Sequence, residues 1–290
     1  MLGRQSLTNG KIQVEVKLHG AELVSLKKVD CAEEYMWCGN AKYWGRVSPI
    51  LFPFVGKLEK QEYRHNGKIY TQIPQHGFAR DSEFEIVDKS KDTIWLRLIK
   101  DEKWKEKYPF ECELIVGYKL ENTIVHVMWK VINTGDKDLH FSIGAHPAFA
   151  CDDGLEDYSI DFHVDDKEIS CGLLNEDGVL SEKSKIVKLQ KGILHLSDEL
   201  FESDALIMNG CNLKKATLLK GDSPILQVEF DTPLLGIWSP ANKNAPFVCI
   251  EPWYGRCDRQ GFKGELSERE YGNTLKSGEI FEKGYMIKLI

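Results

Sequence analysis

Residues 111–135 read ECELIVGYKLENTIVHVMWKVINTG, and this stretch decides the fold. Apolar and polar side chains alternate along it with a period of two residues. That period is typical of a β-strand with one buried face, whereas a helix would repeat every three to four residues. The stretch therefore predicts long strands that bury one side and expose the other.

The same alternation recurs along most of the chain. It is found in residues 11–29, 92–100, 158–166, 185–194, 216–231 and 284–290. Turn signals separate many of these segments: His19-Gly20, Asn66-Gly67, Gly135-Asp136, Asp177-Gly178 and Gly221-Asp222. Helical turns are expected only near 101–108 and 197–203, and no βαβ alternation suggests a parallel sheet. We therefore predict an all-β antiparallel sandwich in which residues 1–290 form a single domain, because no linker interrupts them.

Composition excludes several classes of protein. The 290 residues are 42% hydrophobic, which suffices for a full core, and 29% charged, with a net charge of −7. The sequence contains no apolar run long enough to span a membrane and no basic block suited to nucleic acid. The first 16 residues lack a signal-peptide pattern. We expect a cytoplasmic monomer or homodimer that binds a small molecule, and neither nucleic acid nor a membrane.

Eight cysteines stand at positions that form no CxxC pair. A zinc ribbon or a thioredoxin-type motif is therefore disfavoured. Because the chain is large and lacks a secretion signal, we expect reduced core thiols.

Four segments look least like strands and are the expected location of any chemistry: 44–56, 74–84, 143–150 and 249–258. Two of them carry a histidine beside a glycine or a proline, His76 in Gln75-His76-Gly77-Phe78 and His146 in Ala145-His146-Pro147-Ala148-Phe149. Rigid backbone of this kind suits a positioned acid or base. Surface or packing roles are expected for the other six histidines.

Glu251 follows the apolar strand 247–250 and precedes Pro252. A carboxyl group at the end of a buried strand is costly unless it is paired or used, and desolvation there would raise its pKa towards that of a general base working near neutrality. The alternative is a salt bridge from Glu251 to Arg256 or Arg46.

Three further charged residues are candidates for ligand binding. Arg46, beside Trp44, offers a donor fork for hydroxyl or carboxylate groups, or forms an ion pair at the base of a loop. Arg80 binds ligand or braces its own loop through a neighbouring acid. Asp204 by itself resembles a carboxylate at the start of a strand.

Other reaction classes lack their motifs. The sequence contains no GxSxG, P-loop or GxGxxG pattern. His76 and His146 could share a metal with Glu251, but the sequence lacks HxH and HExxH spacings, so we expect neither a metal nor an organic cofactor.

Taken together, the motifs resemble the aldose 1-epimerase (galactose mutarotase) family, and most closely its shorter, LacX-like bacterial branch. The matching segments are Gly45-Arg46, His76-Gly77-Phe78, Gly144-Ala145-His146-Pro147-Ala148-Phe149, Asp204-Ala205-Leu206 and Ile250-Glu251-Pro252-Trp253. The similarity covers essentially the whole chain, and the two histidine segments are its most specific parts.

This resemblance implies a β-supersandwich with an open sugar cleft, and an isomerase that interconverts the anomers of a free aldohexose. By position, His146 would be the general acid that protonates the ring oxygen, and Glu251 the general base that takes the proton of the anomeric hydroxyl. His76 would hydrogen-bond near the ring oxygen, and Arg46 and Asp204 would hold sugar hydroxyls. Such chemistry needs an acid and a base without a cofactor.

Two alternatives remain open. A related branch acts on hexose 6-phosphates, for which Arg80, with Lys57 and Lys60, could hold the phosphate, although a net charge of −7 offers no steering towards an anion. The chain could also be a non-catalytic sugar-binding or regulatory protein with the same cleft. Four aromatic residues are candidates for stacking on a sugar: Trp44, Phe149, Trp238 and Trp253.

Overall fold

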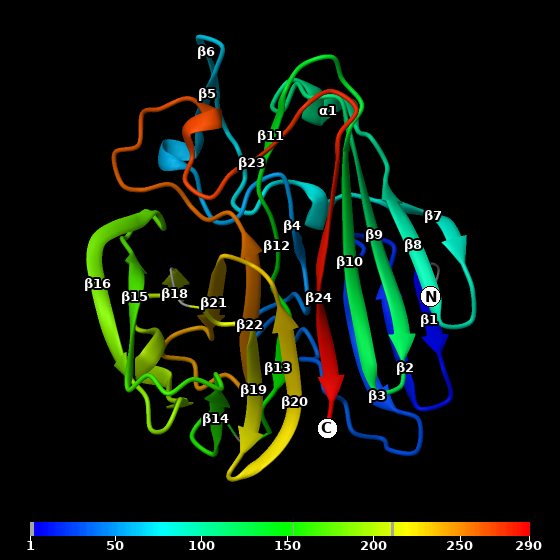
Figure 1. The fold of residues 1–290 in the computed structure, drawn as a ribbon, viewed down its shortest axis with the longest axis vertical. Helices are drawn as coiled ribbons and strands as arrows, with labels where there is room; N and C mark the ends of the chain where they lie inside the picture. The colour runs from blue at the N-terminus through cyan, green and yellow to red at the C-terminus, as the bar shows by residue number, and fades with distance from the viewer. Residues whose placement is uncertain (1–2, 153, 210–211) are drawn as a thin grey trace.

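The computed structural model describes residues 3–152, 154–209 and 212–290 (Figure 1). Strands dominate it, and neighbouring strands within each sheet of the described residues run antiparallel. The predicted all-β antiparallel class is therefore confirmed. In the same part of the chain, no helix is long and apolar enough to cross a membrane.

The larger sheet is built around the stretch 111–135, which forms a hairpin as its alternation predicts. In the described residues this sheet has nine strands, in the order β17-β14-β19-β20-β24-β10-β9-β8-β7. Their bounds are β7 (Phe84–Lys89), β8 (Thr93–Leu98), β9 (Cys112–Glu121), β10 (Ile124–Asn133), β14 (Tyr158–Asp161), β17 (Ile193–His195), β19 (Lys215–Lys220), β20 (Ser223–Phe230) and β24 (Ile280–Leu289).

The second large sheet carries the segments that the sequence analysis singled out. It runs in the order β16-β15-β18-β21-β22-β12-β4, and β13 also pairs with β22. Its strands are β4 (Ile50–Leu51), β12 (Ile143–Ala145), β13 (Ala148–Ala150), β15 (Glu168–Leu174), β16 (Leu180–Lys188), β18 (Leu206–Asn209), β21 (Leu234–Trp238) and β22 (Phe247–Tyr254).

Smaller elements surround these sheets. A three-stranded sheet, beside β7 to β9 in Figure 1, comprises β1 (Arg4–Thr8), β2 (Ile12–Lys17) and β3 (Leu23–Lys28), and two-stranded pairs comprise β5 (Tyr63–His65) with β6 (Lys68–Tyr70) and β11 (Leu139–Phe141) with β23 (Asn273–Leu275). The helical segments are α1 (Glu102–Lys105) and the 3₁₀ turns η1 (Glu59–Gln61), η2 (Ala79–Asp81), η3 (Asp198–Phe201) and η4 (Leu266–Glu268). The two predicted helical turns are confirmed as α1 and η3.

The two large sheets share one apolar core, and β22 shows how. Val248 and Ile250 join the core cluster, to which β10 contributes Val127 and β24 contributes Ile287. Burying such a side chain stabilises the fold by about 1.5–3 kcal/mol. Because side chains alternate along a strand, Cys249 and its period-two neighbours face away from this core. The outer face of β22 is therefore available for a site.

Two expectations about strand boundaries are wrong. Strand β22 does not end at Ile250 but continues through Glu251 and Pro252 to Tyr254. Pro252 lies between the stretch of β22 that pairs with β13 and the stretch that pairs with β12, so its missing N–H is tolerated there. The segment 185–194 is two strands, since a turn at Gly192, with φ of +82°, separates β16 from β17.

The loops assigned from sequence also contain strands. Segment 44–56 holds β4, segment 143–150 holds β12 and β13, and segment 249–258 holds the second half of β22. The strands are only two or three residues long in the first two segments, which is too short for alternation to mark them.

Six of the cysteines in the described residues, Cys31, Cys38, Cys112, Cys151, Cys249 and Cys257, are free thiols, as predicted, and the last three of them are buried. Cys211 lies outside the described residues.

Candidate active site

A cavity of about 250 Å³ opens on the outer face of the second large sheet. Its wall comes from parts of the chain that are far apart in sequence. The lining residues are Trp44, Val55, Gly56, Gln75, His76, Arg80, His146, Leu174, Gly178, Asp204, Ala205, Ile207, Trp238, Glu251, Trp253 and Cys257. Five of the six predicted site residues are among them, and Arg46 is not.

Strand β22 places Glu251 and Trp253 side by side on the cavity face. The neighbouring strands contribute Gly236 opposite Glu251 and Gly144 opposite Trp253. A Cβ atom at either glycine would lie 2.6 Å from the Trp253 indole. The ring thus occupies space that only glycine leaves free, and its Nε1–H donates to the carbonyl of Ala145 at 3.2 Å.

His146 lies in the short turn between β12 and β13, where its N–H donates to the carbonyl of Pro49 at 3.2 Å. Its imidazole stacks on Trp44, with ring centroids 4.7 Å apart, and meets Trp238 edge-on at 5.4 Å. The ring is thereby fixed with Nε2 3.3 Å from Oε2 of Glu251. The two groups are close enough for an ion pair, yet in the described structure Oε2 of Glu251 has no aligned hydrogen-bond partner.

His76 adopts a left-handed backbone conformation, with φ of +65°. The following Gly77 is required because a Cβ there would lie 2.2 Å from the carbonyl oxygen of Phe52. The N–H of Gly56 donates to Nδ1 of His76 at 3.1 Å. In the neutral ring the proton therefore sits on Nε2, which makes that nitrogen a hydrogen-bond donor.

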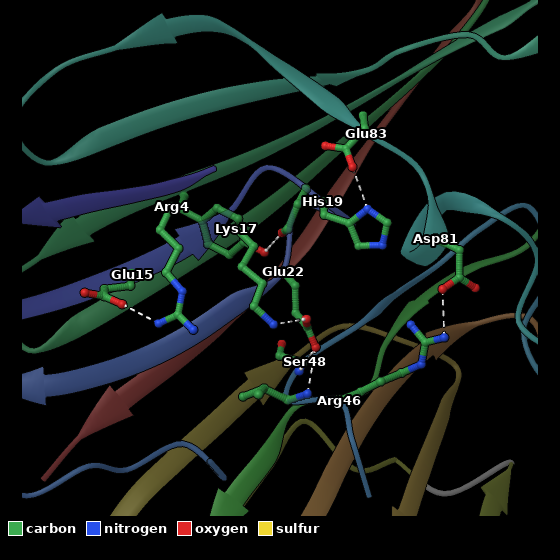
Figure 2. A network of polar contacts seen from close by, with 12 residues as sticks. Arg4, Glu15, Lys17, His19, Glu22, Arg46, Ser48, Asp81 and Glu83 are labelled. Atoms are coloured by element: carbon green, nitrogen blue, oxygen red, sulfur yellow. Dashed lines mark hydrogen bonds and ion pairs between the residues drawn. The ribbon is translucent and has the colours of Figure 1, made fainter. Parts of the chain in front are cut away.

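Arg80 and Arg46 share one acid, Asp81, but differ in position. Nη2 of Arg46 lies 2.8 Å from Oδ1 of Asp81, and Figure 2 shows the guanidinium turned towards that carboxylate. Nε of Arg80 is 3.6 Å from Oδ2 of Asp81 and has no hydrogen-bond partner in the described ranges. Arg80 thus lines the cavity with only a long ion pair to Asp81, while Arg46 forms the shorter ion pair with Asp81 and lies outside the lining.

The loop that carries Arg46 is anchored by Glu22. Its Oε1 accepts hydrogen bonds from the backbone N–H groups of Val47, at 2.6 Å, and Ser48, at 2.9 Å (Figure 2). Lys17 lies 3.4 Å from the other oxygen. A charged acceptor for two backbone donors is a strong anchor, and it holds the segment that also positions Trp44.

Asp204 also has a left-handed backbone, with φ of +68°, just before β18. Its Oδ1 accepts from the N–H of Ala205 at 2.7 Å, and its side chain borders the open side of the cavity. It is exposed, in contrast to Glu251, whose side chain is 1% exposed.

Burial shifts the pKa values of Glu251 and His146 in opposite directions. Desolvation, followed by the nearby charge of Asp204, raises the pKa of Glu251 well above its usual value. Desolvation and the charge of Arg80 lower the pKa of His146 to about 3, and the same causes lower that of His76. The raised value for Glu251 agrees with the expectation from sequence. Burial thus favours an uncharged pair, a carboxylic acid beside a neutral imidazole, over an ion pair.

Several alternatives from the sequence can now be decided. Glu251 is not bridged to Arg256, which contacts Glu270, nor to Arg46. Phe149 does not line the cavity, because the alternation of β13 directs it into the core opposite Ala148. Trp44, Trp238 and Trp253 do line it.

Sequence reasoning missed one residue at the base of the site. The donor atoms of His146, Cys249 and Glu251 all lie within 4.8 Å of one another, so these three side chains could hold a metal ion. The signal was the Cys-x-Glu spacing, which places both side chains on one face of a strand. The spacing carries this meaning only when the strand continues through Glu251, as β22 does.

The chain belongs to the aldose 1-epimerase family, whose family model matches residues 3–285. It is 32% identical over 265 residues to the chromosomal LacX protein of Lactococcus lactis subsp. lactis, a match that covers 86% of this chain and 87% of that protein.

Solved structures agree. One is described as a galactose mutarotase related enzyme from Lactobacillus acidophilus, with a TM-score of 0.92, 34% identity, and coverage of 99% of this chain and 97% of that one. Another is a galactose mutarotase-like protein from Lactobacillus casei, with a TM-score of 0.93, 29% identity, and coverage of 99% and 100%. The predicted family and its LacX-like branch are thus confirmed.

Proposed function

We propose that this protein is an aldose 1-epimerase that interconverts the α and β anomers of a free aldohexose. The observation that carries the proposal is the buried pair of His146 Nε2 and Glu251 Oε2, 3.3 Å apart at the base of a cavity walled by tryptophans. An acid and a base at this separation match the two oxygens that must exchange protons.

Both reacting oxygens of a pyranose, the ring oxygen O5 and the anomeric O1, are bonded to C1. They therefore stand closer together than two hydrogen-bonded atoms, and one close pair of side chains can reach both. A ring cannot fit between atoms 3.3 Å apart, so the sugar lies over the pair. Such placement provides both proton transfers without moving either side chain far.

The proton balance closes within the pair. His146 gives its proton to O5 as the C1–O5 bond breaks, and Glu251 takes the proton of the O1 hydroxyl as the C1=O1 double bond forms. Rotation about C1–C2 presents the other face, and reclosure returns both protons. Burial favours the uncharged form of the His146–Glu251 pair. Hydrogen bonds from the hydroxyls of a bound sugar to the carboxylate favour the charged form, imidazolium with carboxylate, from which ring opening begins.

The other lining residues hold the substrate. The Nε2–H of His76 donates near O5, and the exposed carboxylate of Asp204 accepts from sugar hydroxyls. Trp44 and Trp238 already pack on the His146 ring and offer apolar faces to the C–H groups of the sugar.

Polarimetry of freshly dissolved α-D-glucose and α-D-galactose tests this function. The protein should accelerate the change in rotation, and H146N and E251Q should each lose about 10²- to 10⁴-fold in rate, because each removes one proton-transfer group. Circular dichroism should show both variants folded. A wild-type protein that accelerates no free aldose excludes this proposal.

A second candidate is a hexose-6-phosphate 1-epimerase, and Arg80 favours it. Its side chain lines the cavity and is 16% exposed, and within the described residues its Nε has no hydrogen-bond partner. Lys57 and Lys60 do not support it: Lys57 donates to the carbonyl of Asp177, and neither lysine lines the cavity. Comparison of free and 6-phosphorylated glucose, with R80A as the variant, separates the two substrates.

The third candidate is a non-catalytic sugar-binding protein. It predicts saturable sugar binding by calorimetry without any effect on the rate of anomerisation. The buried acid–base pair argues against it, since binding alone does not require an uncompensated Glu251 carboxyl in the base of the cavity.

A further inference from the structure

One group beside the acid–base pair has no part in the proposed epimerase chemistry. Cys249 lies on β22, two residues before Glu251, and its side chain is buried. Its Sγ, one ring nitrogen of His146 and one carboxylate oxygen of Glu251 form a group within 4.8 Å. These are a thiol, an imidazole and a carboxyl, the three side-chain groups that bind zinc in proteins.

We propose that His146, Cys249 and Glu251 form a binding site for Zn²⁺ or a similar divalent transition metal, whose occupation inhibits the protein. The site has three protein ligands and leaves a fourth position open towards the cavity. This arrangement matches zinc sites in which water or a small ligand completes the tetrahedron.

The backbone brings the three donors together. Residues two apart on a strand point to the same face, so Cys249 and Glu251 approach one point from a single rigid strand. His146 reaches the same point from the turn between β12 and β13, and β13 pairs directly with Cys249 through Ala148. The site therefore rests on strands and not on a long loop.

The distances fit a metal. Donors in a tetrahedral zinc site stand roughly 3.3 to 3.7 Å apart, given metal–ligand distances of about 2.0 to 2.3 Å. The observed separation of His146 Nε2 and Glu251 Oε2 is 3.3 Å. The limit of 4.8 Å for the whole group leaves the thiol about one ångström to move, within reach of a small change in its side-chain torsion.

The burial of Glu251 and His146 favours metal binding at this site. The side chains of Glu251 and His146 are 1% and 9% exposed, and Oε2 of Glu251 is buried without a hydrogen bond from any described residue. An unsatisfied buried oxygen costs free energy, which coordination would recover.

The charges balance. A thiolate and a carboxylate carry two negative charges, which neutralise a divalent cation in a site of low polarity, and the thiol proton and the proton of the acid–base pair leave to solvent. Asp204 faces the pair and favours a cation, whereas Arg80 and Arg46 oppose it. The preference is for metals that bind sulfur and nitrogen over Mg²⁺ or Ca²⁺, which take oxygen donors.

Binding is tested with Co²⁺, which reports a thiolate ligand through a charge-transfer band in the near ultraviolet. Chelator-treated, reduced wild-type protein is titrated with Co²⁺, and Zn²⁺ is then added to displace it. We expect a saturable band from one thiolate that Zn²⁺ abolishes. Absence of the band up to millimolar Co²⁺ overturns the proposal, whether or not the protein is an epimerase.

Two cysteine variants locate the ligand. C249S and C249A should lose the band, whereas C257S should keep it, because Cys257 is a buried thiol at the same cavity but outside the group of three donors. C249A serves as the second variant should C249S not fold. A band that survives in both Cys249 variants, or disappears in C257S, contradicts the assignment.

The inhibitory consequence rests on the proposed function. A metal on His146 and Glu251 occupies the groups that move protons, so Zn²⁺ should stop wild-type mutarotation, and C249S should need roughly tenfold more Zn²⁺ or more. Acceleration by Zn²⁺, or equal inhibition of C249S and wild type, overturns this role. An inactive wild type with a Co²⁺ band would instead contradict only the epimerase proposal.

Discussion

Two buried acids, Glu251 and Asp258, lie seven residues apart in the chain and have different surroundings. Glu251 is paired with His146, and Asp258 is paired with Arg269. Both side chains of the second pair are 3% exposed, so its burial matches that of the first. Arg269 donates to Asp258 at 2.6 Å, to the carbonyl of Arg256 at 2.7 Å and to the hydroxyl of Ser142 at 3.3 Å. Asp258 also accepts from the N–H of Glu59.

The difference lies in how far each pair is satisfied. The Asp258–Arg269 pair has a partner on each side, whereas the described surroundings of Glu251 and His146 leave Oε2 and Nδ1 without one. A satisfied pair fixes the chain, and an unsatisfied pair keeps hydrogen-bonding capacity for a ligand. One segment thus serves structure at Asp258 and, under the proposed function, catalysis at Glu251.

The largest expected effect separates activity from stability at Glu251. E251Q should lower kcat by about 10²- to 10⁴-fold, because the amide cannot accept the anomeric proton. Its free energy of unfolding in urea should stay within about 1 kcal/mol of wild type or rise, because no charge-assisted bond is lost. A strongly destabilised E251Q would show that this pair is structural and remove the contrast.

The converse is expected at Arg269. R269M should destabilise the fold by about 3–5 kcal/mol, because it leaves the Asp258 carboxylate buried and uncompensated. Urea unfolding measures the loss, and the remaining folded protein should keep its kcat. The matched control is R259M, because Arg259 forms an exposed pair with Glu270 and should cost no more than about 1 kcal/mol. Equal losses in both variants would contradict the role of burial.

Sequence predicts the two pairs unequally, for physical reasons. Alternation of apolar and polar residues predicts β9 and β10 because one face of each strand is more exposed to solvent. Strand β22 is buried on both faces and shows no such alternation, so its second half resembles a loop in the sequence. The resemblance of their motifs to the aldose 1-epimerase family identifies His146 and Glu251 as candidate site residues. Nothing local marks Asp258, because its partner comes from eleven residues further along and its role appears only with the tertiary structure.

Arg46 is a second residue whose environment depends on the tertiary structure and cannot be predicted from the sequence alone. Its sequence setting beside Trp44 leaves both a ligand contact and an ion pair open, and the structure places it in an ion pair with Asp81. Which of two neighbouring arginines faces a cavity depends on the packing of η2, which spacing cannot supply.

The next prediction concerns Gly236, which leaves space for the indole ring of Trp253 beside Glu251. G236A should destabilise by about 1–3 kcal/mol, because the added Cβ would lie 2.6 Å from the indole ring. G135A is the control, since its Cβ would make only an ordinary contact at 3.4 Å. Thermal unfolding compares them. If G236A lost no more stability than G135A, the close packing around Trp253 would not contribute to the stability of the fold.

The pH dependence of stability tests the unsatisfied pair directly. The pKa of His146 falls from 6.5 to about 3 on folding, so between these values the unfolded chain binds the extra proton at this residue and the contribution of His146 to stability rises with pH. H146N lacks this contribution. Its stability relative to wild type should therefore be greatest near pH 3 and decline towards pH 7, by up to about 1.4 kcal/mol per pH unit. Parallel stability curves for H146N and wild type would contradict the lowered pKa.

The smallest effect distinguishes Arg46 from Arg80. R46A removes a half-exposed ion pair and should change stability by less than about 1 kcal/mol and KM by about threefold at most. R80A removes a partly buried cation from the cavity lining and should raise KM about tenfold or more, as expected for a hydrogen bond to a charged group. Michaelis curves on the preferred sugar compare the two. A larger KM effect in R46A than in R80A would mean that Arg46 leaves Asp81 when substrate binds, and would restore the ligand contact that its sequence setting suggested.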